Sequence, residues 1–195
     1  MYVITPMFRV SYPYVFKPRK NELSGKDEFS LVALFKKGED LSKLHVEILR
    51  AAREKWGENV QITKTEHGTY QLTNPGKPSF AIRLPLRDQG EREGEKGLPM
   101  GYEKGAMFLN LKSTTRPGLV NAQNEDIIDE SDFYAGCYAR AAINAYAYDQ
   151  KGNRGVAFGL QNVQKMKDGE VLSGRVKAQD CFEPVASDSA EEIFA

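Results

Sequence analysis

The chain has 195 residues, of which 41% are hydrophobic and 28% charged, proportions that suit one globular domain. Its formal net charge is zero, but five acids and no basic residue follow Lys177, so residues 1–177 carry 27 basic against 22 acidic groups. There is no run of 18 apolar residues to span a membrane, and two cysteines, Cys137 and Cys181, are too few for a disulfide scaffold. These features predict a mildly basic body with an acidic tail, in a reducing cytoplasm.

Two strands are predicted before residue 40. Residues 8–17 alternate in polarity, so one face should carry Phe8, Val10, Tyr12, Tyr14 and Phe16. Pro13 lacks a donor for the strand ladder, which places this strand at an edge or at a bend. After a polar turn over residues 18–27, the nearly continuous apolar run at 28–36 predicts a buried strand.

One helix is predicted, from Asp40 to Trp56. Its apolar stripe follows helical spacing and consists of Leu41, Leu44, Ile48, Ala52 and Trp56. Asp40 can cap the start, and Gly57 can close the end.

The middle of the chain has a weaker pattern. Residues 69–73 and 80–84 are candidates for short strands, and 87–105, with five glycines, predicts a loop. Another strand is predicted over 106–114. A turn at 116–118 and an acidic loop at 124–132 follow it.

The clearest element is a long hairpin, with strands at 136–148 and 155–165 around a turn at 149–153. One face of its first strand is small and apolar, and the other carries Tyr138, Arg140, Ala142, Asn144, Tyr146 and Tyr148. Several strands, one helix and long Gly-rich loops together predict a mainly β protein built on a small elaborated barrel.

The sequence lacks the motifs of common enzymes. Neither a phosphate-binding loop, nor a nucleophile elbow, nor a metal-ligand spacing of His and Cys occurs, so we expect no catalysis, no cofactor and no metal. One alternative is a metal-dependent nuclease that uses the acidic loop residues Glu125, Asp126, Asp129, Glu130 and Asp132.

Aromatic strands with basic ends indicate a surface that binds single-stranded nucleic acid. Bases stack on tyrosine rings and guanidinium planes, and basic side chains neutralise phosphates. The candidate contacts are Tyr12, Tyr14, Lys17, Lys36, Lys37, Lys112, Arg116, Tyr138, Arg140, Tyr146, Tyr148 and Arg154. The alternative for the tyrosines is packing beneath the helix or a loop, and the alternative for the cations is a solvated strand end.

The last residues form a second candidate site. Residues 184–195 are small and acidic, and a handle for a protein partner is predicted from Asp188, Glu191, Glu192 and Phe194. A terminus that only aids solubility is the alternative.

Five stretches between about residues 28 and 172 resemble an OB-fold family of bacteriophage single-stranded DNA-binding proteins: FSLVALFKKGED, AAREKWG, PLRDQGE, AMFLNLKSTTRPGLV and YAGCYARAAINAYAYDQKGNRGVAFGLQNVQKMKDGE. The last is the most specific. The resemblance implies an OB-fold barrel with a helical insertion. We therefore expect residues 1–180 to form an OB-fold single-stranded DNA-binding domain and residues 181–195 to form a flexible acidic tail.

The same resemblance implies sequence-independent binding of single-stranded DNA in phage replication and recombination, within the host cell cytoplasm. The tail would recruit replication proteins. Whether the chain forms a homodimer is left open. Phe194 departs from relatives whose last residue is aromatic, because Ala195 follows it. The competing interpretation from another class is a structural or assembly β-barrel protein of a phage particle.

Overall fold

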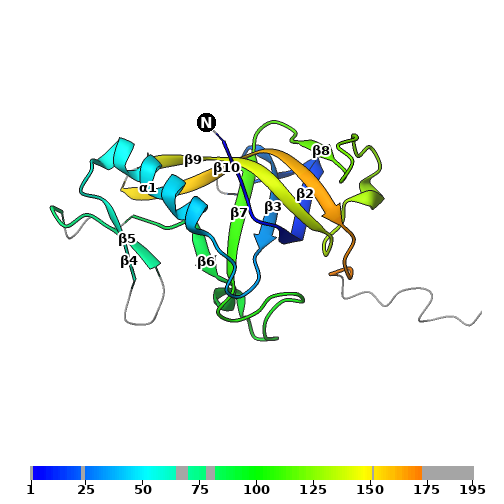
Figure 1. The fold of residues 1–195 in the computed structure, drawn as a ribbon, viewed down its shortest axis with the longest axis horizontal. Coiled ribbons are helices and arrows are strands. Elements are labelled where there is room, and N and C mark those ends of the chain that lie inside the picture. The colour runs from blue at the N-terminus through cyan, green and yellow to red at the C-terminus, as the bar shows by residue number, and fades with distance from the viewer. Residues whose placement is uncertain (1, 23–24, 65–69, 78–81, 151, 173–195) are drawn as a thin grey trace, which may run out of the picture.

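A computed structural model describes residues 2–22, 25–64, 70–77, 82–150 and 152–172 (Figure 1). The predicted tail and the boundary at residue 180 therefore lie outside the described residues. The strands are β1 (Val3–Ile4), β2 (Phe8–Lys20), β3 (Asp27–Leu34), β4 (Gln61–Lys64), β5 (Tyr70–Thr73), β6 (Leu86–Asp88), β7 (Met107–Ser113), β8 (Gly118–Val120), β9 (Tyr138–Gln150) and β10 (Asn153–Lys167). One α-helix, α1 (Ser42–Trp56), and two short 3-10 turns, η1 (Gln89–Arg92) and η2 (Glu130–Asp132), complete the described elements.

Five strands close into a barrel. β2 pairs with β3 and β9, β3 pairs with β7, and β9 pairs with β10, all antiparallel. The ring closes where β7 and β10 pair in parallel. The third barrel strand thus lies beside the fifth, and the fourth returns to the first, which is the strand order of an OB-fold. The predicted mainly β barrel with one helix is confirmed.

The helix covers one end of this barrel and agrees with its prediction. Leu44, Ile48, Ala51 and Ala52 are buried in the same core as the barrel strands. The carboxylate of Asp40 accepts a 2.9 Å hydrogen bond from the Ser42 amide, although Leu41 is the N-cap residue. At the other end, Gly57 has a φ of +96° and donates to the carbonyl of Arg53, as a helix-ending glycine does.

The prediction that five residues of the first strand share one face is wrong. Phe8 and Val10 are buried, but Tyr12 is 53% exposed with a φ of +45°, and the register with β3 shifts around it. Such a bulge adds a residue to one strand and inverts the alternation beyond it. Val15 is consequently buried and Tyr14 faces outward. Pro13 lies in this bend, as predicted.

The long hairpin is confirmed in both strands. Along β9 the alanines at 139 and 141 and Ile143 are buried, while the intervening residues are at least partly exposed. The hairpin runs across the whole molecule in Figure 1, and its tip reaches the neighbourhood of α1.

The segment predicted as a loop at 87–105 begins instead with β6 and η1. β6 is only three residues long and exists because it pairs with β7, which no local pattern reveals. β1, β4 and β8 went unpredicted for the same reason, whereas β5 agrees with the strand expected at 69–73. Of the strand expected at 80–84, only residues 82–84 are described. Among them, Ile82 and Arg83 each form an isolated β-bridge.

Candidate nucleic-acid interface

On the outer face of β3 and β7, side chains of the two strands lie opposite one another in pairs. Ser30 lies opposite Lys112, Val32 opposite Asn110, and Leu34 opposite Phe108. β2 extends the first row, because Tyr14 pairs with Ser30. In OB-folds this is the face, together with the loops beside it, that receives oligonucleotides.

Two hollows lie on this face and meet at Asn110 and Lys112, which line both of them. The first, of about 560 Å³, extends over β2 and β3 and includes Tyr12, Tyr14 and Tyr102. The second, of about 1100 Å³, extends over β6 and the hairpin and includes Tyr70, Tyr146 and Tyr148. Together they form one groove, with tyrosines along both halves.

Basic side chains line both halves of the groove. The first half carries Arg19, Lys20, Arg92 and Lys112, and the second adds Arg83 and Arg87. Two of them are paired with acids of the same groove. Lys112 donates to Glu28 at 2.8 Å, and Arg87 pairs with Glu91. A phosphate entering the groove would therefore compete with carboxylates already in place.

Glu28 remains an anion on the groove floor. Burial acts to raise the pKa of Glu28, but hydrogen bonds from Lys112 and Asn21 and the charges of Lys112 and Lys26 outweigh it, so the pKa lies below its usual value. Burial raises the pKa of the Tyr146 phenol, and the charge of Glu28 raises it further. Tyr146 therefore stays neutral, and it lines the second hollow together with Lys112.

Small residues on β10 let the hairpin tyrosines lie across that strand. Gly155 pairs with Tyr148, and Ala157 pairs with Tyr146. A methyl group added at Gly155 would come within 2.4 Å of the Tyr148 hydroxyl, so the ring occupies the space above the glycine. Tyr146 remains 46% exposed and lines the second hollow.

The structure brings only part of the predicted contact set into this groove. Tyr12, Tyr14, Lys112, Tyr146 and Tyr148 line it. Lys17 pairs with Glu130 at 2.9 Å in a neighbouring hollow of about 540 Å³, which shares Tyr14 with the groove.

The remaining predicted contacts lie outside the two hollows. Tyr138 and Lys36 line a separate hollow of about 160 Å³, and Lys37 is exposed beyond β3. Arg140 donates to Gln164 at 2.8 Å, Arg116 lies over the Phe16 ring, and Arg154 donates to Asp149.

Seven aromatic or basic residues of the groove were absent from the predicted set. Arg87, Arg92 and Tyr102 come from the segment expected to be a loop, and Arg83 comes from a stretch expected to be a short strand. Tyr70 comes from the short strand β5, and Arg19 and Lys20 come from the end of β2, where a turn was expected. A sequence signal existed for three of them, since two arginines and a tyrosine recur within the Gly-rich run from 87 to 105. What the sequence did not reveal was that this run folds back onto β7.

The acidic loop is occupied by local contacts. The Asp129 carboxylate accepts from the Ser131 amide, Glu125 accepts from Asn121, and Glu130 pairs with Lys17. Among the described residues, no group of three or more His, Cys, Asp or Glu side chains is arranged to hold a metal ion. Nor does the described part of the chain contain a helix long and apolar enough to cross a membrane.

Comparison with known proteins gives concordant matches. The model of a family described as the Enterobacter phage Enc34 ssDNA-binding protein matches residues 1–194. Over 193 residues the chain is 28% identical to putative protein p50 of Acyrthosiphon pisum secondary endosymbiont phage 1, which covers 96% of this chain and 95% of that protein.

Two solved structures share the fold. The single-stranded DNA-binding protein of bacteriophage Enc34, solved in complex with ssDNA, superposes with a TM-score of 0.65 and 20% identity, over 88% of this chain and 89% of that one. The single-stranded DNA-binding protein gp2.5 of bacteriophage T7 superposes with a TM-score of 0.53 and 11% identity, over 90% of this chain and 97% of that one.

Proposed function

Since the chain belongs to the family of the Enterobacter phage Enc34 ssDNA-binding protein, we propose that it binds single-stranded DNA without base preference in the groove across β3, β7 and the hairpin. The resemblance found from sequence motifs is thereby confirmed at the level of the family. We further propose that this binding serves phage replication and recombination and involves no catalysis.

One observation carries the proposal: the two hollows meet on β7 and both combine tyrosine rings with basic side chains. Aromatic faces accept any base, and cations that follow the backbone make binding independent of sequence. The unpaired strand suits this groove because its bases are free to turn toward the rings, whereas duplex bases are stacked on one another.

The test is binding of a labelled oligonucleotide and of its matched duplex at two salt concentrations. The single strand should bind more tightly, with little difference between mixed sequences. Affinity should fall steeply with salt, since each phosphate contact on a single strand contributes about 0.7 to the log–log slope. Equal affinity for the duplex would contradict the proposal, and the absence of any salt-dependent binding would favour the structural-protein alternative. Cleavage that depends on magnesium and on Asp126 and Asp129 would favour the nuclease.

The acidic terminus is the second part of the proposal. The last described residue, Leu172, donates its amide to the carbonyl of Ala135 and lines a hollow of about 530 Å³ together with Tyr12 and Tyr102. The chain thus leaves the barrel beside the first half of the groove. Five acids and no basic residue lie beyond Lys177, so the chain becomes acidic within about eight residues of Leu172 along the sequence.

We expect that segment to compete weakly with DNA and to recruit replication proteins through Asp188, Glu191, Glu192 and Phe194. A tethered segment reaches an effective concentration on the order of millimolar. Truncation after Pro184 should tighten DNA binding at low salt, with a difference that shrinks as salt screens the charges. Phe194→Ala should abolish capture of a phage replication protein without changing DNA affinity. Unchanged affinity after truncation, together with unchanged capture, would leave the tail a solubilising terminus.

A further inference from the structure

Two arginines lie on a buried aromatic ring in the middle of the groove. Phe108 is fully buried on the outer face of β7, in a small cluster with Val32 and Leu34 that is separate from the barrel core. The guanidinium carbons of Arg92 and Arg87 lie 4.8 and 5.4 Å from the centre of its ring. Both distances are within the range of a cation–π contact. The ring therefore supports two planar cations whose side chains remain exposed.

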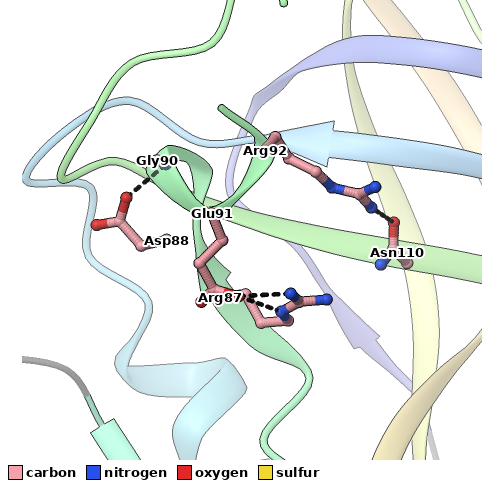
Figure 2. Close-up of polar contacts among 6 residues, drawn as sticks. All are labelled: Arg87, Asp88, Gly90, Glu91, Arg92 and Asn110. Carbon is pink, nitrogen blue, oxygen red and sulfur yellow. Dashed lines mark hydrogen bonds and ion pairs between the residues drawn. The ribbon is translucent and has the colours of Figure 1, made fainter. Parts of the chain in front are cut away.

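The polar contacts of these arginines differ, as Figure 2 shows. Arg87 meets Glu91, which offsets its charge. Arg92 reaches from η1 to Asn110 on β7, with a 3.3 Å hydrogen bond to the amide oxygen. Within the described residues Arg92 forms no ion pair. It lies next to Asn110, which with Lys112 lines both hollows.

A single buried amide anchors the segment that carries Arg92 and begins two residues after Arg87. The Gln89 side chain is 1% exposed, and its Nε2 donates to the carbonyls of Phe35 and Met107, each at 2.9 Å. Its Oε1 accepts from the amide of Glu103 at 2.8 Å. These bonds join the ends of β3 and β7 to both ends of the segment 89–103. A buried amide with all of these partners is costly to replace by a group that leaves them unpaired.

We propose that Arg92 and Arg87, backed by Phe108, form a cationic stacking platform for the single strand at the centre of the groove, and that Gln89 is the positioning residue that holds them there. This inference rests on the proposed function. A guanidinium plane can stack on a base with one face while the other lies on an aromatic ring. Gln89 does not touch the strand; it fixes the direction from which η1 presents Arg92 and from which the adjoining end of β6 presents Arg87.

Substitutions at Arg92 separate stacking from charge. Arg92→Lys keeps the charge but loses the planar cation, so it should weaken binding roughly 5- to 150-fold, the range of one stacked base, with an unchanged salt slope. Arg92→Gln should weaken binding at least as much and also lower the slope by about 0.7. Lys43→Gln, an equal charge change on the exposed face of α1, is the control and should leave both quantities close to wild type.

Gln89 is tested by a double-mutant cycle. Gln89→Met should weaken binding and lower the salt slope in the wild-type background, yet add nothing to a variant that already carries Arg87→Gln and Arg92→Gln. A role in stability alone would act equally in both backgrounds. Thr5→Val, which removes another buried hydrogen bond at β1, should lower the melting temperature and leave the slope unchanged.

A further variant covers the case in which Gln89→Met does not fold. Asp88→Ala removes the carboxylate that accepts from the amides of Gly90 and Gly105, which loosens η1 without opening the core. It should lower the salt slope in the same way. If wild type binds the oligonucleotide and the Arg92 and Asp88 variants bind with its affinity and slope, the platform is refuted while the proposed function stands. If wild type does not bind, the proposed function itself fails.

Discussion

The two ends of β9 carry the same sequence pattern in different surroundings. Tyr138 and Arg140 at one end, and Tyr146 and Tyr148 at the other, project from the same face of one strand. Eight residues of extended chain place Tyr138 and Tyr146 roughly 26 Å apart. The Lys167 ammonium group covers the Tyr138 ring at 4.7 Å, and Arg140 is bonded to Gln164. Tyr146 and Tyr148 instead lie over a strand of small residues and line the groove.

The difference shows that a face of a long strand is not a single site. Its first half lies on the closed barrel beside β2 and β1, and its second half extends with β10 toward α1. Each half has neighbours that the pattern within β9 does not specify. Which half binds DNA depends on what the rest of the chain places beside it.

The largest effect expected from this comparison is at Tyr146. Tyr146→Ala should weaken binding of single-stranded DNA by roughly 1–3 kcal/mol, because a half-exposed aromatic ring is removed from the second half of the groove. Tyr138→Ala, the matched change at the other end, should cost less than about 0.5 kcal/mol. Titration of both variants with one oligonucleotide measures the two values, and melting curves verify that both are folded. Equal losses would mean that the whole face of β9 contacts the strand.

A smaller effect is expected when a side chain is added to β10 at the glycine beneath Tyr148. Gly155→Val forces the Tyr148 ring to move, since even a single added carbon would meet its hydroxyl at 2.4 Å. We expect a loss of about 1 kcal/mol in DNA binding without any change in salt slope, because no charge is altered. Gly94→Val, the same substitution at a glycine with open space around it, is the control. Normal binding by Gly155→Val would show that the position of Tyr148 is irrelevant.

The smallest expected effect is an increase in affinity for DNA. Glu28→Gln frees Lys112 from its carboxylate partner and should tighten binding by about 0.2–1 kcal/mol, the range for a partly exposed ion pair. Glu54→Gln breaks an ion pair with Arg50 on α1 and should leave DNA affinity unchanged. Weaker binding by Glu28→Gln would show instead that Glu28 positions Lys112 for the strand.

The pH dependence of that gain follows from the pKa of Glu28. This pKa lies below its ordinary value, so Glu28 is ionised throughout the neutral range and the gain should be constant there. As the pH falls through the lowered pKa, wild-type Glu28 becomes protonated and the two proteins should converge. The stability that the ionised carboxylate contributes is lost over the same acidic interval. Affinities measured across an acid series check both points. A gain that shrinks already near neutral pH would mean that Glu28 is not fully ionised there.

The sequence alone determined the features that depend on local patterns. The alternation of β9, the stripe and ends of α1 and the apolar run of β3 each follow from side chains a few residues apart. Those patterns, with five motif stretches, were enough to predict a β-barrel of a phage single-stranded DNA-binding family. They also identified five of the residues that line the groove, among them Tyr146 and Lys112.

Only the tertiary structure decided which of the candidate residues share a surface. The bulge at Tyr12 turns two tyrosines outward, and the parallel pairing of β7 with β10 brings Lys112 toward the hairpin tyrosines. Hydrogen bonds of the Gln89 side chain hold a Gly-rich segment against β7, and one of them joins it to Phe35, 54 positions away. Contacts across such separations depend on strand register and barrel closure. Periodicity within one segment carries no information about either.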